Sequence, residues 1–177
     1  LLKSKLSLPF VKAVYPTANK AGIIKTDTEI HGIVLKGVDK DYNWNYIDAN
    51  LIAGNVPQYV ENERSNDVVV SKIIADKMLL NVGDDVRLWF VGEDMKTRGR
   101  KFTVKGIYET GLTECDERFI YCDLNQIRRL NGWEKDVAQI VEVPSDNIGY
   151  AIFEITEKPK LRQNKVTINK QILNSNG

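Results

Sequence analysis

The stretch that decides the fold class is VVVSKIIADKML, residues 68–79. Its first three residues are valines, which predict a short buried strand because β-branched side chains favour extended backbone. Ser71 suits a helix N-cap, since its hydroxyl can accept one of the free backbone N–H groups at a helix start. The apolar residues that follow recur at helical spacing and predict one buried helix face: Ile74, Ala75, Met78 and Leu79. A buried strand joined directly to an amphipathic helix places both elements on one core.

On the C-terminal side of this stretch, the sequence predicts two strands joined by a polar hairpin. The pieces are a turn at residues 81–84, a strand at 85–92, a polar loop at 93–99 and a strand at 101–109. Trp89 and Phe90 are neighbours in the first of these strands, and we expect both to face the core.

A second strand-and-helix unit follows an acidic connection at residues 110–117. Asp123 with Gln126 three residues later is typical of a capping box. The unit consists of a strand at 118–122 and a helix at 124–130, with Leu124, Ile127 and Leu130 on one side and Asn131-Gly132 as its stop. Two more strands are predicted at 137–143 and 151–156, and residues 158–177 are polar and weakly patterned.

On the N-terminal side, the pattern is mostly extended. In order it predicts the end of a helix at 1–8, strands at 10–17 and 22–28 joined by a turn at 19–22, an extended run at 29–38, a helix at 42–51 and a polar loop at 58–66. Strands and short helices therefore alternate irregularly, which predicts an α+β fold rather than a doubly wound parallel sheet.

Composition excludes several classes of protein. The chain has 177 residues, 42% of them hydrophobic, and a formal net charge of +1. So small a charge gives no long-range attraction to nucleic acid. No run of ~18 apolar residues is present, so no segment reads as a membrane span. The chain has no initiator Met, and we expect it to begin inside a larger gene product.

Residues that could support catalysis are few. His31 is the only histidine, and it lies in an extended apolar run, where a structural role is the default. Cys115 and Cys122 lie close enough in sequence for a disulfide across a turn, although two free thiols fit equally well. Carboxylates gather in the acidic connection, where a solvated loop is the ordinary explanation: Glu109, Glu114, Asp116 and Glu117.

Three other patterns suggest binding sites. Residues 39–45 (DKDYNWN) place oxygen ligands at alternate positions, as a calcium loop does, but Trp44 stands where the turn requires Gly, and a turn before a helix explains the same residues. Tyr42, Trp44 and Tyr46 resemble a sugar platform, although Trp44 is expected to pack inward. Basic residues cluster at the hairpin and on the later helix: Lys96, Arg98, Arg100, Lys101, Arg128 and Arg129. They are not interleaved with aromatic residues as in a nucleic-acid site, and no phosphate-binding loop is present. We therefore predict no catalytic, cofactor or metal residues.

Several segments, taken in order, resemble the extracytoplasmic core of MacB/FtsX-like ABC-transporter permeases, closest to the lipoprotein-releasing branch. They are FVKAVYP (10–16), AGIIKT (21–26), IVLKGVD (33–39), the run to Gly54, VVVSKIIADK (68–77), VGD (82–84) and FTVKGIY (102–108). No segment is assigned to a lipoprotein-gripping loop.

This resemblance implies one extracytoplasmic domain of two lobes. Residues 1–54 and 119–177 would form a mixed α/β lobe with membrane-proximal ends, and residues 55–118 a strand-rich insertion. It also implies partners, namely an ABC ATPase subunit and a second permease copy held through membrane helices outside this chain. The domain would be non-catalytic and would act as a lever in the periplasm, extruding or releasing a substrate such as a lipoprotein.

Two other readings stay open from the residues alone. A free-standing extracytoplasmic binding or regulatory module would need a dedicated ligand pocket. A hydrolase would use the acidic connection or His31. The loops at residues 58–66 and 96–100 are the candidates for partner contact.

Overall fold

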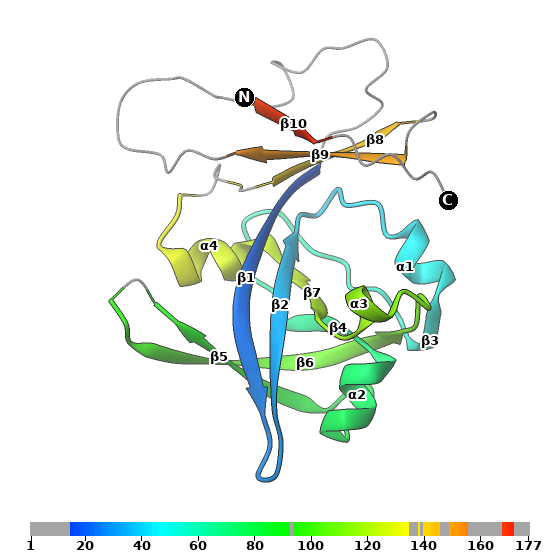
Figure 1. The fold of residues 1–177 in the computed structure, drawn as a ribbon, viewed down its shortest axis with the longest axis vertical. Coiled ribbons are helices and arrows are strands. Elements are labelled where there is room, and N and C mark those ends of the chain that lie inside the picture. The colour runs from blue at the N-terminus through cyan, green and yellow to red at the C-terminus, as the bar shows by residue number, and fades with distance from the viewer. Residues whose placement is uncertain are drawn as a thin grey trace.

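The computed structural model describes residues 15–92, 94–134, 138, 140–145, 149–155 and 168–171. Within those residues the chain forms one ten-stranded sheet and four short helices (Figure 1). In chain order the elements are β1 (Tyr15–Lys25), β2 (Ile30–Val38), α1 (Asn45–Ala49), β3 (Leu51–Gly54), β4 (Asp67–Ser71), α2 (Lys72–Met78), β5 (Asp85–Val91), β6 (Thr97–Tyr108), α3 (Thr113–Asp116), β7 (Phe119–Asp123), α4 (Leu124–Asn131), β8 (Ile140–Ser145), β9 (Gly149–Ile155) and β10 (Ile168–Gln171).

Six of the strands close into a ring, in the order β1-β2-β7-β4-β6-β5 and back to β1. The β2–β7 and β4–β6 pairs are parallel and the other four are antiparallel. The closing pair of β1 and β5 sets Ile23 opposite Trp89 and Ile24 opposite Leu88. Each strand of the ring therefore has a neighbour on both sides, although the β1–β5 contact has only two residue pairs and the β4–β7 contact only one.

The core fills the ring. Alternate residues of each strand point inward, as β5 illustrates with Val86, Leu88 and Phe90, which are all buried. Helices α2 and α4 lie at opposite corners of the view and add their apolar faces to the same core (Figure 1). Gly37 lets α4 approach β2, because a Cβ at this position would lie 2.9 Å from the Cα of Leu124.

β1 also belongs to a second part of the sheet. Its first residues pair with β8, with Tyr15 opposite Glu142 and Thr17 opposite Ile140. β8 pairs with β9, and β9 with β10, and these strands cross the top of Figure 1. Among the described strands, β1 alone joins the ring to this extension.

Several local predictions are confirmed. The Ser71 hydroxyl accepts a hydrogen bond from the Ile74 backbone N–H at 3.1 Å and caps α2. Residues 81–84 turn the chain, with the Asp84 N–H donating to the Asn81 carbonyl. Leu124, Ile127 and Leu130 are buried on α4, and Gly132 ends that helix in the left-handed conformation.

The predicted turn at residues 19–22 is wrong. β1 runs through it without a break and pairs with β2 from Thr17 opposite Val38 to Lys25 opposite Ile30. Gly22 serves a close approach instead of a turn, since a Cβ there would lie 2.6 Å from a ring carbon of Phe90. The chain reverses at residues 26–29, where the Thr26 N–H donates to the Glu29 carbonyl at 2.9 Å.

Other predicted bounds also differ from the structure. The helix predicted at 42–51 is only α1, because β3 begins at Leu51 and pairs with β6. The acidic connection holds a helical turn, α3, and the polar hairpin loop ends earlier because β6 begins at Thr97. The predicted helix at residues 1–8 lies outside the described residues.

The predicted division into two lobes stays a prediction. Within the described residues, β1, β2 and β7 of the first predicted lobe are neighbours in the ring, and β4, β6 and β5 of the second complete it.

Candidate functional site

His31 has a structural contact. It lies half-buried on β2, and its Nε2 is 2.6 Å from the backbone carbonyl oxygen of Glu117. The contact joins β2 to the residues just before β7, its parallel neighbour. The ring nitrogen thus has a backbone partner, as the sequence-based expectation of a structural histidine requires.

The two cysteines are free thiols in different environments. Cys115 is exposed on α3, and Cys122 is buried on β7 with its Sγ 3.4 Å from the Asp123 carbonyl. Burial raises the pKa of the Cys122 thiol well above its ordinary value, so this thiol stays protonated and unreactive.

The acidic connection is more ordered than a solvated loop. Asp116 is 2% exposed, and its Oδ2 accepts from the backbone N–H groups of Thr110 and Gly111 at 3.0 and 3.1 Å. Its Oδ1 accepts from the Thr110 hydroxyl at 2.6 Å. The Ser71 hydroxyl donates to the Asp116 carbonyl, so the N-cap of α2 also fastens α3. The contacts of the Asp116 carboxylate hold the backbone of this connection in place. Glu109 and Glu114 are exposed and take no part in them.

Asp123 and Gln126 also act across the fold. Asp123 accepts from the Asn125 N–H, which caps α4, and from the Ser65 N–H, both at 2.9 Å. Gln126 does not complete a capping box, because its amide donates to the Ser65 carbonyl and to Asn66 Oδ1 at 2.7 and 2.8 Å. The end of the loop at residues 58–66 is therefore fixed to α4. Burial raises the pKa of Asp123.

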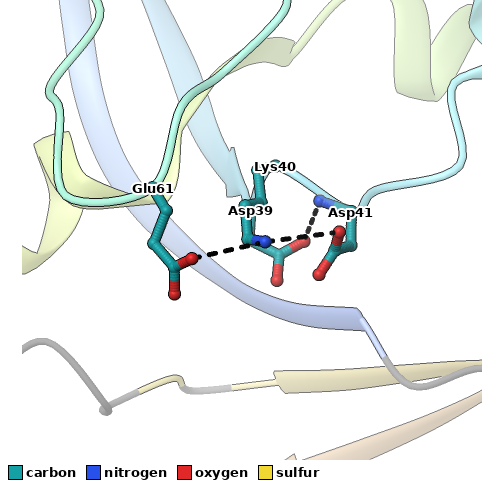
Figure 2. A network of polar contacts seen from close by, with 4 residues as sticks. All are labelled: Asp39, Lys40, Asp41 and Glu61. Carbon is teal, nitrogen blue, oxygen red and sulfur yellow. Dashed lines mark hydrogen bonds and ion pairs between the residues drawn. The ribbon is translucent and has the colours of Figure 1, made fainter.

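In the calcium-like loop at residues 39–45, side-chain oxygens accept hydrogen bonds from the loop's own backbone, and Lys40 contacts two carboxylates. Asp39 Oδ1 accepts from the Asp41 N–H at 3.1 Å, and Asn43 Oδ1 accepts from the Asn45 N–H at 3.0 Å. Figure 2 shows Lys40 between two carboxylates, 3.8 Å from Asp41 and 3.4 Å from Glu61. Asp41 and then Glu61 raise the pKa of Lys40. Among the described residues, no group of three or more His, Cys, Asp or Glu side chains is arranged to hold a metal ion.

Aromatic side chains gather on the outer face of β2 and β7. Tyr42 and Trp44 lie edge to face, 5.2 Å between ring centroids, and Tyr121 of β7 lies 5.8 Å from Trp44. Lys36 of β2 lies over the rings of Tyr42 and Tyr121, at 5.8 and 5.5 Å. The predicted sugar platform is thus brought together in part, because Tyr46 points elsewhere and is 47% exposed.

This aromatic cluster also packs inward. Tyr59 donates a hydrogen bond to the Asp67 carbonyl at 3.0 Å, and Tyr108 donates to the Phe119 carbonyl at 2.8 Å. Desolvation raises the pKa of both phenols. The sequence identified Tyr42 and Trp44 but not Tyr59 and Tyr121, which come from distant segments.

The basic hairpin is partly neutralised. Arg98 pairs with Asp94 at 2.9 Å, and Lys101 pairs with Asp85 at 2.6 Å. Hydrogen bonds from Lys101 and Thr103 lower the pKa of Asp85. The expectation that Trp89 faces the core is wrong: Phe90 is inside, and Trp89 lies on the opposite face of β5 because successive side chains alternate.

Comparison with known proteins identifies the family. A family model described as MacB-like periplasmic core domain matches residues 1–156. No curated protein sequence matches the chain at a significant level. No helix within the described segments is long and apolar enough to cross a membrane.

Two solved structures have a similar fold. The extracellular domain of the noncanonic ABC-type transporter YknZ from Gram-positive bacteria is 18% identical, with a TM-score of 0.56, over 82% of this chain and 71% of that one. The periplasmic region of MacB from Actinobacillus actinomycetemcomitans is 15% identical, with a TM-score of 0.50, over 83% of this chain and 64% of that one.

The α+β fold is similar to that of these domains, and the family match covers most of the chain. The chain therefore belongs to the MacB-like periplasmic core domain family, the extracytoplasmic portion of inner-membrane ABC-transporter permeases.

Proposed function

We propose that this domain is the non-catalytic lever of an ABC permease, which couples ATP-driven motion of a partner ATPase subunit to extrusion or release of a substrate outside the membrane. Its other partner would be a second copy of the permease. We propose a lipoprotein as the first substrate to test, in line with the resemblance to the lipoprotein-releasing branch.

The observation that carries this proposal is the continuity of the sheet. Hydrogen-bonded strands run from β10 through β9 and β8 into β1, and from β1 around the closed ring. A rigid secondary element can transmit a displacement between distant parts of a protein. Since β1 is the strand shared by the extension and the ring, motion applied to one would pass to the other through it.

The role of the polar candidates is consistent with a lever. His31, Asp116 and Asp123 each make a contact with a segment distant in the sequence, in the case of Asp116 through its backbone carbonyl. Such contacts stiffen a domain, as a lever requires, and ATP hydrolysis would take place in the partner ATPase.

The test is an insertion that interrupts β1 where the two parts of the sheet meet. Two glycines placed between Pro16 and Thr17 shift Tyr15 and Pro16 out of register with β8, while the pairing of residues 17–25 with β2 is kept. In the full permease with its ATPase, reconstituted in membranes, we expect ATP hydrolysis to continue and substrate release to be lost.

A matched insertion separates this effect from a general one. Two glycines between Asp27 and Thr28 lengthen the exposed β1–β2 turn without changing any strand pair, and release should be retained. The lever proposal is wrong if hydrogen exchange shows that the junction insertion has removed the pairing of β1 with β8 and substrate release still proceeds at the normal rate.

A further inference from the structure

The outer face of the four antiparallel strands β2, β1, β5 and β6 is exposed. Register places Gly32, Ile23, Trp89 and Gly99 in one row across these strands. Ile23 is 40% exposed, and Val91, two residues beyond Trp89, is 58% exposed. The row is therefore an apolar strip that no described part of the chain covers.

Trp89 forms the centre of this strip and its ring lies flat. A Cβ at position 99 would lie 2.9 Å from Cζ3 of the indole, so the ring rests on the glycine of the neighbouring strand. On its other side Trp89 is opposite Ile23 of β1, and Gly32 lies beyond Ile23, where a Cβ would contact nothing within 4 Å. The two large side chains of the row are therefore flanked at each end by a residue without a side chain.

A row of cations runs beside the strip. Arg87 stands directly opposite Lys101, and the register of Ile24 with Leu88 brings Lys25 of β1 to the level of Arg87. Lys101 pairs with Asp85, and the Arg87 guanidinium lies 5.7 Å from the Trp89 ring centroid. Lys25 and Arg87 have no carboxylate partner among the described residues. Like charges on adjacent strands are unfavourable unless something neutralises them.

The hairpin that carries Trp89 has a second unusual residue at its turn. Met95, in the β5–β6 turn, is 82% exposed and adopts φ 60°. The left-handed region is uncommon for residues other than Gly, Asn and Asp. In Figure 1 the β5–β6 hairpin extends past β1 on the left of the view, so this tip projects from the body. An exposed, strained methionine at the turn of this hairpin is suited to contact a partner.

We propose that this face binds an amphipathic helix of a partner protein, with its apolar side on Ile23, Trp89 and Val91 and an acidic edge along Lys25, Arg87 and Lys101. The inference goes beyond the lever function and does not depend on it.

The spacing of the two rows favours a helix. Neighbouring strands are ~4.8 Å apart, and one turn of an α-helix rises ~5.4 Å, so a helix that crosses the strands offers about one carboxylate per turn to one cation per strand. An added strand would pair at an edge of the sheet and would leave this face uncovered. A helix laid on the face is the remaining way to cover it with regular structure.

The test uses the full chain and a synthetic helix of ~18 residues, with leucines on one face and a glutamate at each turn along one edge of that face. A scrambled peptide of the same composition and vesicles of phosphatidylglycerol are the comparison probes. We expect the ordered acidic peptide to bind at least about tenfold more tightly than the scrambled one. Only in the ordered peptide do the leucines face the apolar strip while the glutamates face the row of cations. Fluorescence anisotropy of the labelled peptides measures the affinities.

Charge reversal then locates the site. The double variant Lys25→Glu with Arg87→Glu should lose about tenfold or more in affinity for the acidic peptide, and should prefer a peptide whose glutamates are replaced by lysine. Lys77→Glu, on an exposed position of α2, is the matched control and should bind as the original chain does. All three altered side chains are exposed, so thermal unfolding should be unchanged.

Three results would overturn the inference. One is equal binding of the ordered and scrambled peptides. Another is retained binding in the double variant. The third is binding to phosphatidylglycerol vesicles but not to the peptide, which would assign the face to an anionic lipid.

Discussion

At the scale of single residues, the fold depends on side chains that satisfy backbone groups of other elements. Ser71 is fully buried and serves two elements, because its hydroxyl accepts from the Ile74 N–H and donates to the Asp116 carbonyl. Asp116 in turn holds the backbone at residues 110–111. A buried polar group that loses its partner costs more than the bond itself contributes.

Ser71→Ala should therefore destabilise the domain by about 1–3 kcal/mol, since the N-cap of α2 and the contact with Asp116 are both removed. Chemical denaturation measures the change in the free energy of unfolding. Ser71→Thr is the control, because it retains the hydroxyl, and it should recover part of the loss. Equal stability of the alanine variant and the original chain would contradict this role.

Leu79 carries strain that can be removed. It ends α2 at φ 54° and ψ 44°, and its side chain is 85% exposed, so the prediction that it belongs to the buried face of this helix is wrong. The side chain therefore gives little packing in return for the strain. Leu79→Gly should stabilise the domain by roughly 1 kcal/mol, because glycine adopts the left-handed conformation without a Cβ clash. Leu79→Ala keeps the Cβ and should show no comparable gain in melting temperature. A glycine variant that melts no higher than the alanine variant would refute this reasoning.

Asp123 gives a pH dependence with a defined sign. Burial raises its pKa in the folded protein above the ordinary 3.8. The folded protein then binds this proton more tightly than the unfolded chain, so the contribution is full below 3.8 and is lost as pH rises through the folded-state pKa. Relative to Asp123→Asn, the original chain should lose stability as the pH rises from 3.8 towards neutrality. Denaturation at each pH measures the difference in the free energy of unfolding between the two proteins. A difference that stays constant across that range would contradict the prediction.

At the scale of elements, the sequence predicts what is decided locally. The strand β4, the cap of α2 and the stop of α4 at Gly132 follow from residues adjacent to them. The α+β class is also confirmed, because it follows from strands and helices that local residues signal. Gly22, read as part of a turn, is explained only by Phe90 of a distant strand. Asp123 is a similar case, because Ser65, whose N–H it accepts, lies 58 residues away in the sequence. Contacts between distant segments leave no periodic signal in the chain.

The β1–β5 junction can be tested as a pair of elements. Gly22→Ala places a Cβ against the Phe90 ring, and overpacking of this kind costs about 1–3 kcal/mol. Phe90→Leu creates space and is destabilising by itself. In the double variant the two losses should sum to more than the measured loss, because the smaller side chain relieves the clash. Strict additivity in the denaturation free energies would show that Gly22 and Phe90 do not touch.

At the scale of the whole molecule, ring closure couples strands that are far apart. The ring depends on two short seams, the β1–β5 pairs at Ile23 and Ile24 and the β4–β7 pair at Val69 and Tyr121. Opening one seam removes the restraint that keeps the other strands in register, so the ring should open as one unit. Gly22→Ala, which weakens the first seam, should therefore speed hydrogen exchange of slow amides in β4 and β7 by the same factor as in β1 and β5. Hydrogen exchange resolved by residue measures these rates. If only β1 and β5 exchange faster, the six strands are independent neighbours, and a displacement at one side of the ring would not reach the other.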